Sequence, residues 1–335
     1  MTRTLFTNIG LLVTNNPSEA VRAGGTTTPT GEIENAAMIA DNGLVAWVGR
    51  AVDAETGGGF DIDAVVNVHG NTLIPGFVDS HSHIVFAGDR AGEFAARMAG
   101  KPYAAGGIRS TVAATREASD DELRERLHAL LNEMHSQGTT TVEIKSGYGL
   151  DVATEERLVR LAREVTEEVT FLGAHVVPAE FTDNREDYVQ LVIGEMLEKC
   201  APHAKWIDVF CDQGAFNPEQ SEAILRAGIA HGALPRIHAN QLTAGKGIEL
   251  AVSLNAASAD HLSKSSAADI ALLASSNTVA TLLPGAEFST HLESNLGRKF
   301  LDAGATVAIA SDCNPGSSYT TSMPFCIAAA VSLLG

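Results

Sequence analysis

The sequence predicts an α/β fold: a (β/α)8 TIM barrel preceded by part of a small β-sandwich domain. After residue 70, eight short apolar segments alternate with segments that carry helix signals, whereas the first 70 residues lack this alternation. Polar residues, histidines above all, gather at the ends of the apolar segments. Strand–helix units repeated in series are typical of a closed parallel barrel.

Residues 1–70 are expected to form the N-terminal part of a separate β domain. Their apolar stretches, TLFTNIGLLVTN, AAMIADNGLVAWVGR and AVVNVHG, are separated by turns rich in Gly, Asn and Thr. We interpret them as short antiparallel strands. Such strands would leave unpaired edges unless further strands joined them.

The eight segments that follow are interpreted as the barrel strands. They are apolar along most of their length, as expected for parallel strands that are buried on both faces. They span residues 71–79, 139–147, 169–177, 206–212, 234–240, 256–262, 277–284 and 305–312.

The segments between these strands have the start and stop signals of helices. Ser119 and Glu122 form a capping-box pattern ahead of leucines that recur on one helical face. Asn217 and Pro218 predict the first turn of another helix, and Gly232 predicts its end. Helices and strands therefore alternate throughout this region.

Composition excludes several classes of protein. The 335 residues include 23 Lys and Arg against 41 Asp and Glu, a formal net charge of −18, which opposes binding to nucleic acid and to anionic lipid. No apolar run approaches the ~18 residues that cross a bilayer, and the four cysteines form no CxxC pair. We expect a cytoplasmic protein with a small-molecule substrate. The sequence does not decide whether the protein forms a homodimer.

Five of the eleven histidines and one aspartate lie at predicted strand ends. In a (β/α)8 barrel the catalytic groups lie at the carboxyl ends of the strands. The six residues are His81, His83, His175, His238, His261 and Asp312. His81 and His83 are two residues apart on one strand, so their side chains share a face.

Three imidazoles and one carboxylate around an open position suit a catalytic zinc or iron ion. Such a metal would lower the pKa of a bound water towards ~7, and a carboxylate beside it could accept the proton. The expected ligands are His81, His83, His238 and Asp312. Lys145 ends the second strand, but the fourth strand ends in no lysine, so we expect one divalent or trivalent metal ion per chain.

The segment PGFVDSHSH, with the later strand-end histidines and aspartate, resembles the amidohydrolase superfamily. Within it the chain is similar to the imidazolonepropionase family, and the motifs that carry this likeness reach the last predicted strand. They are EIKSGYGLD (143–151), FLGAHVVPAEF (171–181), HANQL (238–242), LLPGAEF (282–288) and ASDCNPGSS (310–318). The resemblance implies a metal-dependent hydrolase of histidine degradation, in which a metal-activated water opens the cyclic amide C–N bond of 4-imidazolone-5-propanoate to give N-formimidoyl-L-glutamate.

The resemblance also implies roles for individual residues. Asp312 would be both metal ligand and proton acceptor, and His261 would orient or polarise the water. Arg90 would bind the carboxylate of the substrate through its guanidinium fork. Further substrate contacts are implied for Tyr103, Tyr148, His175, Asn314, Gly316 and Ser317.

Two features depart from the family pattern. Many amidohydrolases have a glutamate three residues after the histidine of the fifth strand, where this chain has Gln241. Because an amide does not titrate, we assign Gln241 to binding the imidazolone ring and leave proton transfer to Asp312 and His261. The barrel is expected to span residues 71–335 and to stop within its last predicted helix. We therefore expect a truncated chain, which also lacks the strands that would complete the β domain.

Two alternatives remain open. One is another amidohydrolase, such as a nucleobase deaminase, although Gln241 counts against it because ring deamination needs a protonating group at that position. The other is a non-catalytic barrel scaffold that has lost the metal, against which the intact set of ligands argues.

Overall fold

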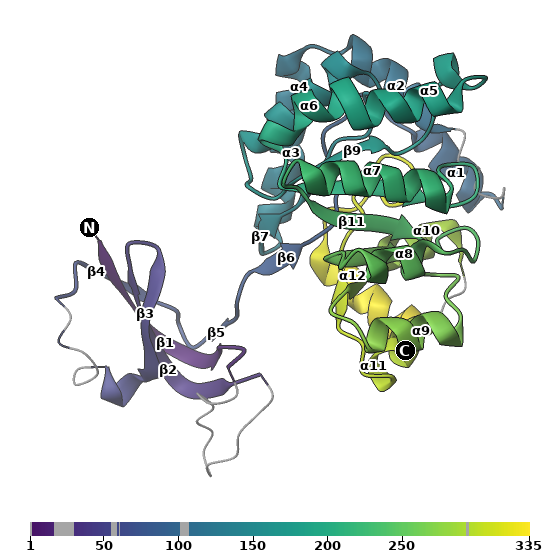
Figure 1. Ribbon diagram of the computed structural model, residues 1–335. Coiled ribbons are helices and arrows are strands. Elements are labelled where there is room, and N and C mark those ends of the chain that lie inside the picture. Colours follow the sequence, from purple (N-terminus) through teal and green to yellow (C-terminus); the bar gives the residue numbers. More distant parts are fainter. Residues whose placement is uncertain (1, 17–29, 55–58, 60, 101–106, 293–294) are drawn as a thin grey trace. The chain divides into compact units, whose positions relative to one another are not determined.

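The computed structural model describes residues 2–16, 30–54, 59, 61–100, 107–292 and 295–335. The chain divides into two compact units, Met1–Gly76 and Phe77–Gly335 (Figure 1). Among the described helices, none is long and apolar enough to cross a membrane.

The described part of the N-terminal unit contains one five-stranded sheet, in the order β3-β2-β1-β4 with β5 also paired to β1. Its strands are β1 (Arg3–Val13), β2 (Glu32–Asp41), β3 (Leu44–Arg50), β4 (Ala64–Asn67) and β5 (Thr72–Leu73). Asn42 and Gly43 both have positive φ (52° and 82°), which suits the tight turn between β2 and β3. Ile9, Leu12 and Ile33 are buried in its small core.

Strand direction in this sheet only partly follows the prediction. β1, β2 and β3 pair antiparallel as expected. β4 instead runs parallel to β1, so the antiparallel prediction for AVVNVHG was wrong. β5 also runs parallel to β1, so the start of the segment 71–79, predicted as the first barrel strand, belongs to this sheet, and only Phe77–Asp79 forms a barrel strand. A parallel neighbour requires a long crossover connection, and residues 14–63 of the chain separate β1 from β4.

The second unit is the predicted (β/α)8 barrel, which the structure confirms. Its strands pair in parallel in two sheets, one of β6 with β7 and one that runs in chain order from β8 to β14. They are β6 (Phe77–Asp79), β7 (Thr139–Val142), β8 (Ile144–Lys145), β9 (Val169–Ala174), β10 (Trp206–Cys211), β11 (Leu234–Ala239), β12 (Ser258–His261), β13 (Val279–Leu282) and β14 (Val307–Ile309).

Backbone bonds beyond β6 and β14 join the first strand position to the last. The Asp312 N–H donates to the His81 carbonyl at 3.0 Å, and the His83 N–H donates to the Cys313 carbonyl at 2.9 Å. The buried Asp79 carboxylate accepts hydrogen bonds from the backbone N–H and the hydroxyl of Ser311. These contacts bring the residues that follow β6 beside those that follow β14.

Helices surround the strands of the barrel (Figure 1). They are α1 (Ala91–Met98), α2 (Ile108–Glu117), α3 (Asp120–Ser136), α4 (Val152–Arg163), α5 (Arg185–Leu191), α6 (Leu197–Cys200), α7 (Pro218–Ala230), α8 (Gly247–Ser253), α9 (Ala267–Ala274), α10 (Pro284–Thr290), α11 (Leu296–Asp302) and α12 (Met323–Ala329). Single turns of 3-10 helix span Ala51–Asp53, Ala179–Phe181 and Ala201–His203, and π-helical turns span Val192–Met196 and Ala330–Leu334.

The helix signals of the sequence are confirmed. Ser119 and Glu122 form the capping box of α3, and Asn217 caps α7. Gly232 has a φ of +88° just beyond the end of α7, a conformation that favours glycine. The buried leucines of α3 and the strands it covers belong to one continuous core, which holds the strand ends in fixed positions.

Candidate active site

Three imidazole rings meet at the carboxyl ends of the barrel strands. His81 and His83 follow β6, His238 lies in β11, and all three side chains are buried. The Nε2 atom of His83 lies 3.2 Å from that of His81 and 3.4 Å from that of His238. These three residues form a group that could hold a metal ion.

Buried carboxylates lie beside the outer nitrogens of two of these rings. Nδ1 of His81 lies 2.7 Å from Oδ2 of Asp260, and Nδ1 of His238 lies 3.0 Å from Oδ2 of Asp208. A carboxylate in this position keeps the ring proton on Nδ1, which leaves the Nε2 lone pair directed inwards.

The spacing of the donor atoms fits a metal ion. Nitrogens at about 2.0–2.1 Å from one tetrahedral ion would lie roughly 3.3 Å from one another, close to the separations of 3.2 and 3.4 Å that the rings adopt. Inward lone pairs at this distance repel one another, and a cation between them would remove that repulsion.

Asp312 lies beside the histidines but farther away. Its Oδ1 is 3.6 Å from Nε2 of both His81 and His83. Burial raises the pKa of Asp312 to about 8, against an opposing hydrogen bond from Ser317. A bound cation would lower that pKa again.

Burial favours the neutral form of four of the rings around this point. Burial, together with neighbouring cationic groups, lowers the pKa of His81, His83 and His261 well below the ordinary value. Burial lowers the pKa of His175 to about 3. Neutral imidazole is the form that binds metal ions and accepts hydrogen bonds.

His261 and Asp312 share an unusual backbone conformation. Their φ angles are +78° and +51°, in the left-handed region that residues other than glycine seldom adopt. Such outliers persist only where surrounding contacts enforce them, and they are frequent at functional sites. The ring of His261 lies 5.3 Å from that of His238 and 5.7 Å from that of His81, measured between centroids.

A network of buried charges lies next to the histidines, and the sequence analysis missed it. Its members are Glu143, Lys145, Asp208, Arg236 and Asp260. Nζ of Lys145 is 2.9 Å from both Glu143 Oε1 and Asp208 Oδ2, and Arg236 Nη2 is 3.4 Å from Asp260 Oδ2. Charged residues inside apolar strands, such as Glu143 and Lys145 in TTTVEIKSG, are the signal that could have revealed it.

The network explains two features of the site. Lys145 donates hydrogen bonds to the carboxylates of Glu143 and Asp208, so its ammonium group is neutralised inside the barrel. Burial by itself would raise the pKa of Asp208, but His238 and Lys145 hold it well below its ordinary value. Asp208 is therefore a charged partner for His238.

A cavity of ≈ 60 Å³ opens onto these groups and gathers most of the residues that the sequence singled out. Those lining it are His83, Arg90, Tyr148, His175, His238, Gln241, His261, Asp312, Asn314 and Ser317. His81 is fully buried and is not part of the lining. Tyr103 lies outside the described residues.

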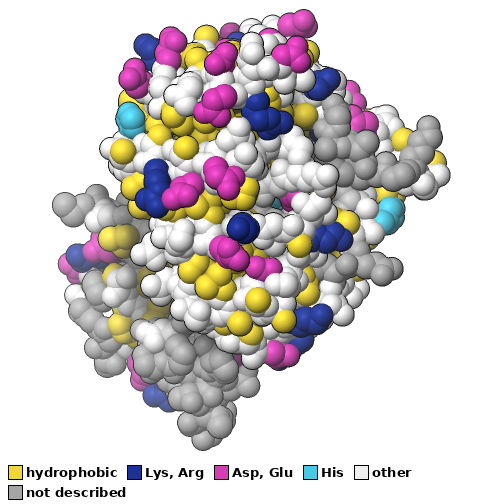
Figure 2. Space-filling model, turned by 45° about the vertical axis from the view of Figure 1, so that its right-hand side comes forward, with side chains coloured by type: hydrophobic (Ala, Val, Ile, Leu, Met, Phe, Trp, Pro, Cys, Tyr) yellow, Lys and Arg dark blue, Asp and Glu magenta, His cyan; other side chains and the backbone are white. Residues whose placement is uncertain are grey.

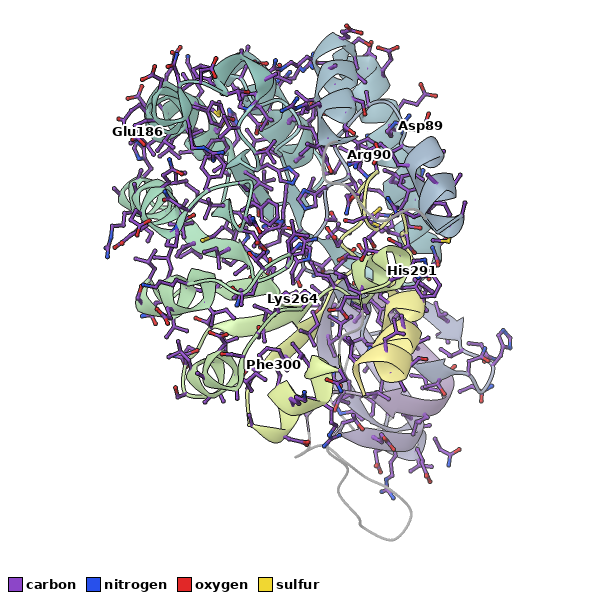
Figure 3. All side chains as sticks on the ribbon, turned by 90° about the vertical axis from the view of Figure 1, so that its right-hand side faces the viewer. Asp89, Arg90, Glu186, Lys264, His291 and Phe300 are labelled. Atoms are coloured by element: carbon purple, nitrogen blue, oxygen red, sulfur yellow. The ribbon has the colours of Figure 1, made fainter. Side chains whose placement is uncertain are left out.

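Arg90 lies beside Asp89 in the loop before α1 (Figure 3). Its side chain is buried, and its Nε and Nη2 donate to the two carboxylate oxygens of Glu93 at 3.1 and 2.7 Å. A Cβ atom added to Gly316 would lie 2.2 Å from Nη1 of Arg90. Gly316 does not line the cavity, but its lack of a side chain allows Arg90 to occupy this position.

The loop after β14 is shaped by the side chain of Asn314. Its Oδ1 accepts hydrogen bonds from the backbone N–H groups of Gly316 and Ser317, both at 2.7 Å. Its Nδ2 donates to the Asp312 carbonyl at 2.7 Å and to the Ser317 hydroxyl at 3.0 Å. Asn314 thus holds Ser317 and Gly316 in place.

Aromatic rings form another part of the cavity wall. His175 stacks on His83 with centroids 5.2 Å apart, and Tyr148 lies 5.5 Å from His175 and 6.0 Å from His83. Gln241 lines the cavity as well, while its backbone N–H donates to Asp212 at 2.9 Å.

Two curated imidazolonepropionases are similar to the chain over nearly its whole length. That of Mycolicibacterium smegmatis is 57% identical over 331 residues, covering 99% of this chain and 81% of the relative. That of Streptomyces avermitilis is 56% identical over 340 residues, again covering 99% of this chain and 81% of the relative. A scan against protein-family models found no match.

Solved structures show the same fold at low sequence identity. A guanine deaminase from C. acetobutylicum matches with a TM-score of 0.67 and 15% identity, over 99% of this chain and 79% of that protein. An adenosine deaminase from Xanthomonas campestris, with bound zinc, matches with a TM-score of 0.69 and 16% identity, over 99% of this chain and 74% of that protein. At such identities the likeness concerns the fold alone.

Proposed function

The chain belongs to the imidazolonepropionase family, and from this premise we propose that it hydrolyses 4-imidazolone-5-propanoate to N-formimidoyl-L-glutamate. Water adds to the ring carbonyl carbon, and the cyclic amide C–N bond breaks. The observation that carries the proposal is an identity of 57% over 99% of the chain, and the converging His81, His83 and His238 are in keeping with it.

The three histidines and Asp312 would hold one divalent or trivalent metal ion, zinc or iron. The inward Nε2 atoms and their spacing support the assignment of the histidines as ligands. The position of Asp312 beside two of the histidines supports its assignment as the fourth ligand. When bound, the ion would activate a water molecule and polarise the amide carbonyl.

Asp312 is the proposed proton acceptor. It lines the cavity, and its carboxylate lies near the histidine nitrogens where the attacking water would be held. A carboxylate there can take the water proton and return it to the ring nitrogen that leaves. His261, which lines the same cavity, orients the water.

The remaining lining residues would recognise the substrate. Arg90 binds the propanoate carboxylate through charge-assisted hydrogen bonds. Gln241 binds the imidazolone ring, because its amide can donate and accept hydrogen bonds. Further contacts would come from Tyr148, His175, Asn314 and Ser317, which line the cavity as well. Gly316, which does not line it, and Tyr103, which lies outside the described residues, are proposed as substrate contacts from the resemblance alone.

One experiment tests the reaction and the metal together. The purified chain, supplied with zinc or iron, is assayed on 4-imidazolone-5-propanoate, guanine, adenosine and cytosine, and its metal content is measured on the same preparation. We expect ring opening of the imidazolone without ammonia release. Ammonia release from a nucleobase would favour a deaminase, and a chain that retains no metal would favour a scaffold.

A further inference from the structure

Glu155 is a buried carboxylate that has no part in the proposed chemistry. It lies in the first turn of α4 and is fully buried. Its Oε1 accepts hydrogen bonds from the backbone N–H groups of Gly149 at 2.7 Å and Leu150 at 2.9 Å. The N–H of Gly147 lies 3.2 and 3.1 Å from its two oxygens, and the Ser146 side chain bonds to it as well.

The loop after β8 depends on these bonds for its shape. Gly147 and Leu150 have φ angles of +104° and +56°, so the chain turns through conformations that need support. A Cβ atom on Gly149 would lie 2.8 Å from the backbone nitrogen of Glu155, which shows how closely the loop packs on α4. Without the carboxylate, three buried N–H groups would lose their acceptor.

This loop carries one cavity side chain and orients another. Tyr148 lies between Gly147 and Gly149 and is 2% exposed, with its ring in the cavity wall. The carbonyl of Gly147 lies 3.0 Å from Nδ1 of His175. A carbonyl can only accept, so the ring proton of His175 sits on Nδ1, and Nε2 is left as an acceptor.

We propose that Glu155 is a positioning residue for substrate recognition: by accepting from the N–H groups on both sides of Tyr148, it places Tyr148 and fixes the ring of His175. The inference rests on the proposed function, in which Tyr148 and His175 contact the substrate. A role confined to helix capping does not account for these bonds, because Asp151 already caps α4 by accepting from the Thr154 N–H at 2.8 Å.

The test compares Glu155→Gln with the matched control Glu156→Gln. Glutamine keeps the size of the side chain and one accepting oxygen, but its NH2 group would stand where Oε2 now accepts from the Gly147 N–H at 3.1 Å. Two donors would then face each other at Gly147, which disturbs the loop. Glu156 is the next residue on the same helix and is only partly buried. Each variant is measured as the metal-loaded enzyme for kcat, KM and thermal unfolding.

We expect Glu155→Gln to raise KM for 4-imidazolone-5-propanoate roughly tenfold or more while kcat changes less than about threefold, because it loosens groups that bind substrate. The control should match the unaltered enzyme. Glu155→Asp, which keeps both acceptors on a shorter side chain, should give a smaller rise and serves as the test if the glutamine variant does not fold. A lower melting temperature with unchanged KM would overturn the inference.

A second readout does not depend on turnover. Nitrogen-15 NMR of the zinc-loaded enzyme should show His175 with its proton on Nδ1, and a mixture of tautomers in Glu155→Gln. An unchanged tautomer would overturn the positioning role. Tyr148→Phe and His175→Asn are measured in parallel: if both have an unaltered KM, the substrate contacts of the proposed function are wrong, while the NMR result still decides whether Glu155 positions His175.

Discussion

At the scale of single residues, the site depends on where protons lie on the histidines. Asp260 and Asp208 hold the Nδ1 side of His81 and His238, so that both Nε2 atoms face His83. Removing such a carboxylate frees the ring to rotate or to exchange tautomers, and each change turns a lone pair away from the metal position.

Asp260→Asn should therefore weaken metal binding about 10- to 100-fold. The affinity is measured by competition with a chromogenic chelator on the purified protein. Asp183→Asn, at an exposed position in the loop before α5, is the control and should keep the original affinity. Equal affinities in the two variants would contradict the role assigned to Asp260.

Gly316→Ala tests the position of Arg90. The added Cβ would lie 2.2 Å from Nη1 of Arg90, so the guanidinium must move. We expect KM to rise about tenfold or more with a smaller change in kcat, as for a lost substrate-binding contact. In the control Gly92→Ala the new Cβ meets nothing within 4 Å, so KM should stay unchanged.

At the scale of elements, the barrel is held together where its first and last strands meet. β6 and β14 are short, and their junction relies on Asp79, Ser311 and the backbone bonds just beyond the strands. The same junction carries His81 and Asp312, so closure of the barrel also brings these two side chains together.

Ser311→Ala should destabilise the fold by about 1–3 kcal/mol, because the buried Asp79 carboxylate loses a donor. The free energy of unfolding is obtained from urea denaturation. The control Ser136→Ala, at an exposed position at the end of α3, should change stability by less than about 0.5 kcal/mol. A loss no larger than that of the control would show that this junction does not depend on the hydroxyl.

Single elements also show where prediction from the sequence stops. The stretch 139–147 was predicted as one strand, and the structure divides it into β7 and β8 at Glu143. The reason is a contact distant in sequence: the carboxylate and the carbonyl of Glu143 both bond to Ser82. The pattern of apolar residues locates a strand, but it carries no information about a contact with a residue far away in the sequence.

At the scale of the whole molecule, charge and metal have separate effects. The charged residues that give the net charge of −18 lie on the surface as well as in the buried site. On the face shown in Figure 2, acidic and basic side chains are interspersed, and the described residues form no continuous basic patch there that would suit a phosphate backbone. The charges that matter for the reaction are instead buried in the barrel.

Metal removal should lower the stability of the whole chain. The metal ion would bind the folded state alone, because His238 lies far along the chain from His81 and His83 and meets them only in the fold. A ligand at 100 times its Kd adds about 2.7 kcal/mol to the free energy of unfolding. Dialysis against a chelator should lower the melting temperature, and added zinc should restore it. Identical melting curves with and without metal would contradict the metal site.

The order of apolar segments and polar strand ends along the chain was enough to predict the barrel and most of the groups around its cavity. Parallel strands place their carboxyl ends at one edge, so histidines at strand ends must meet there whatever the details of packing. His81, His83 and His238 were found in this way. The tertiary structure alone decided how they are held, because Lys145, Asp208 and Glu155 act through contacts between segments far apart in the chain. Such contacts leave no periodic pattern in the sequence.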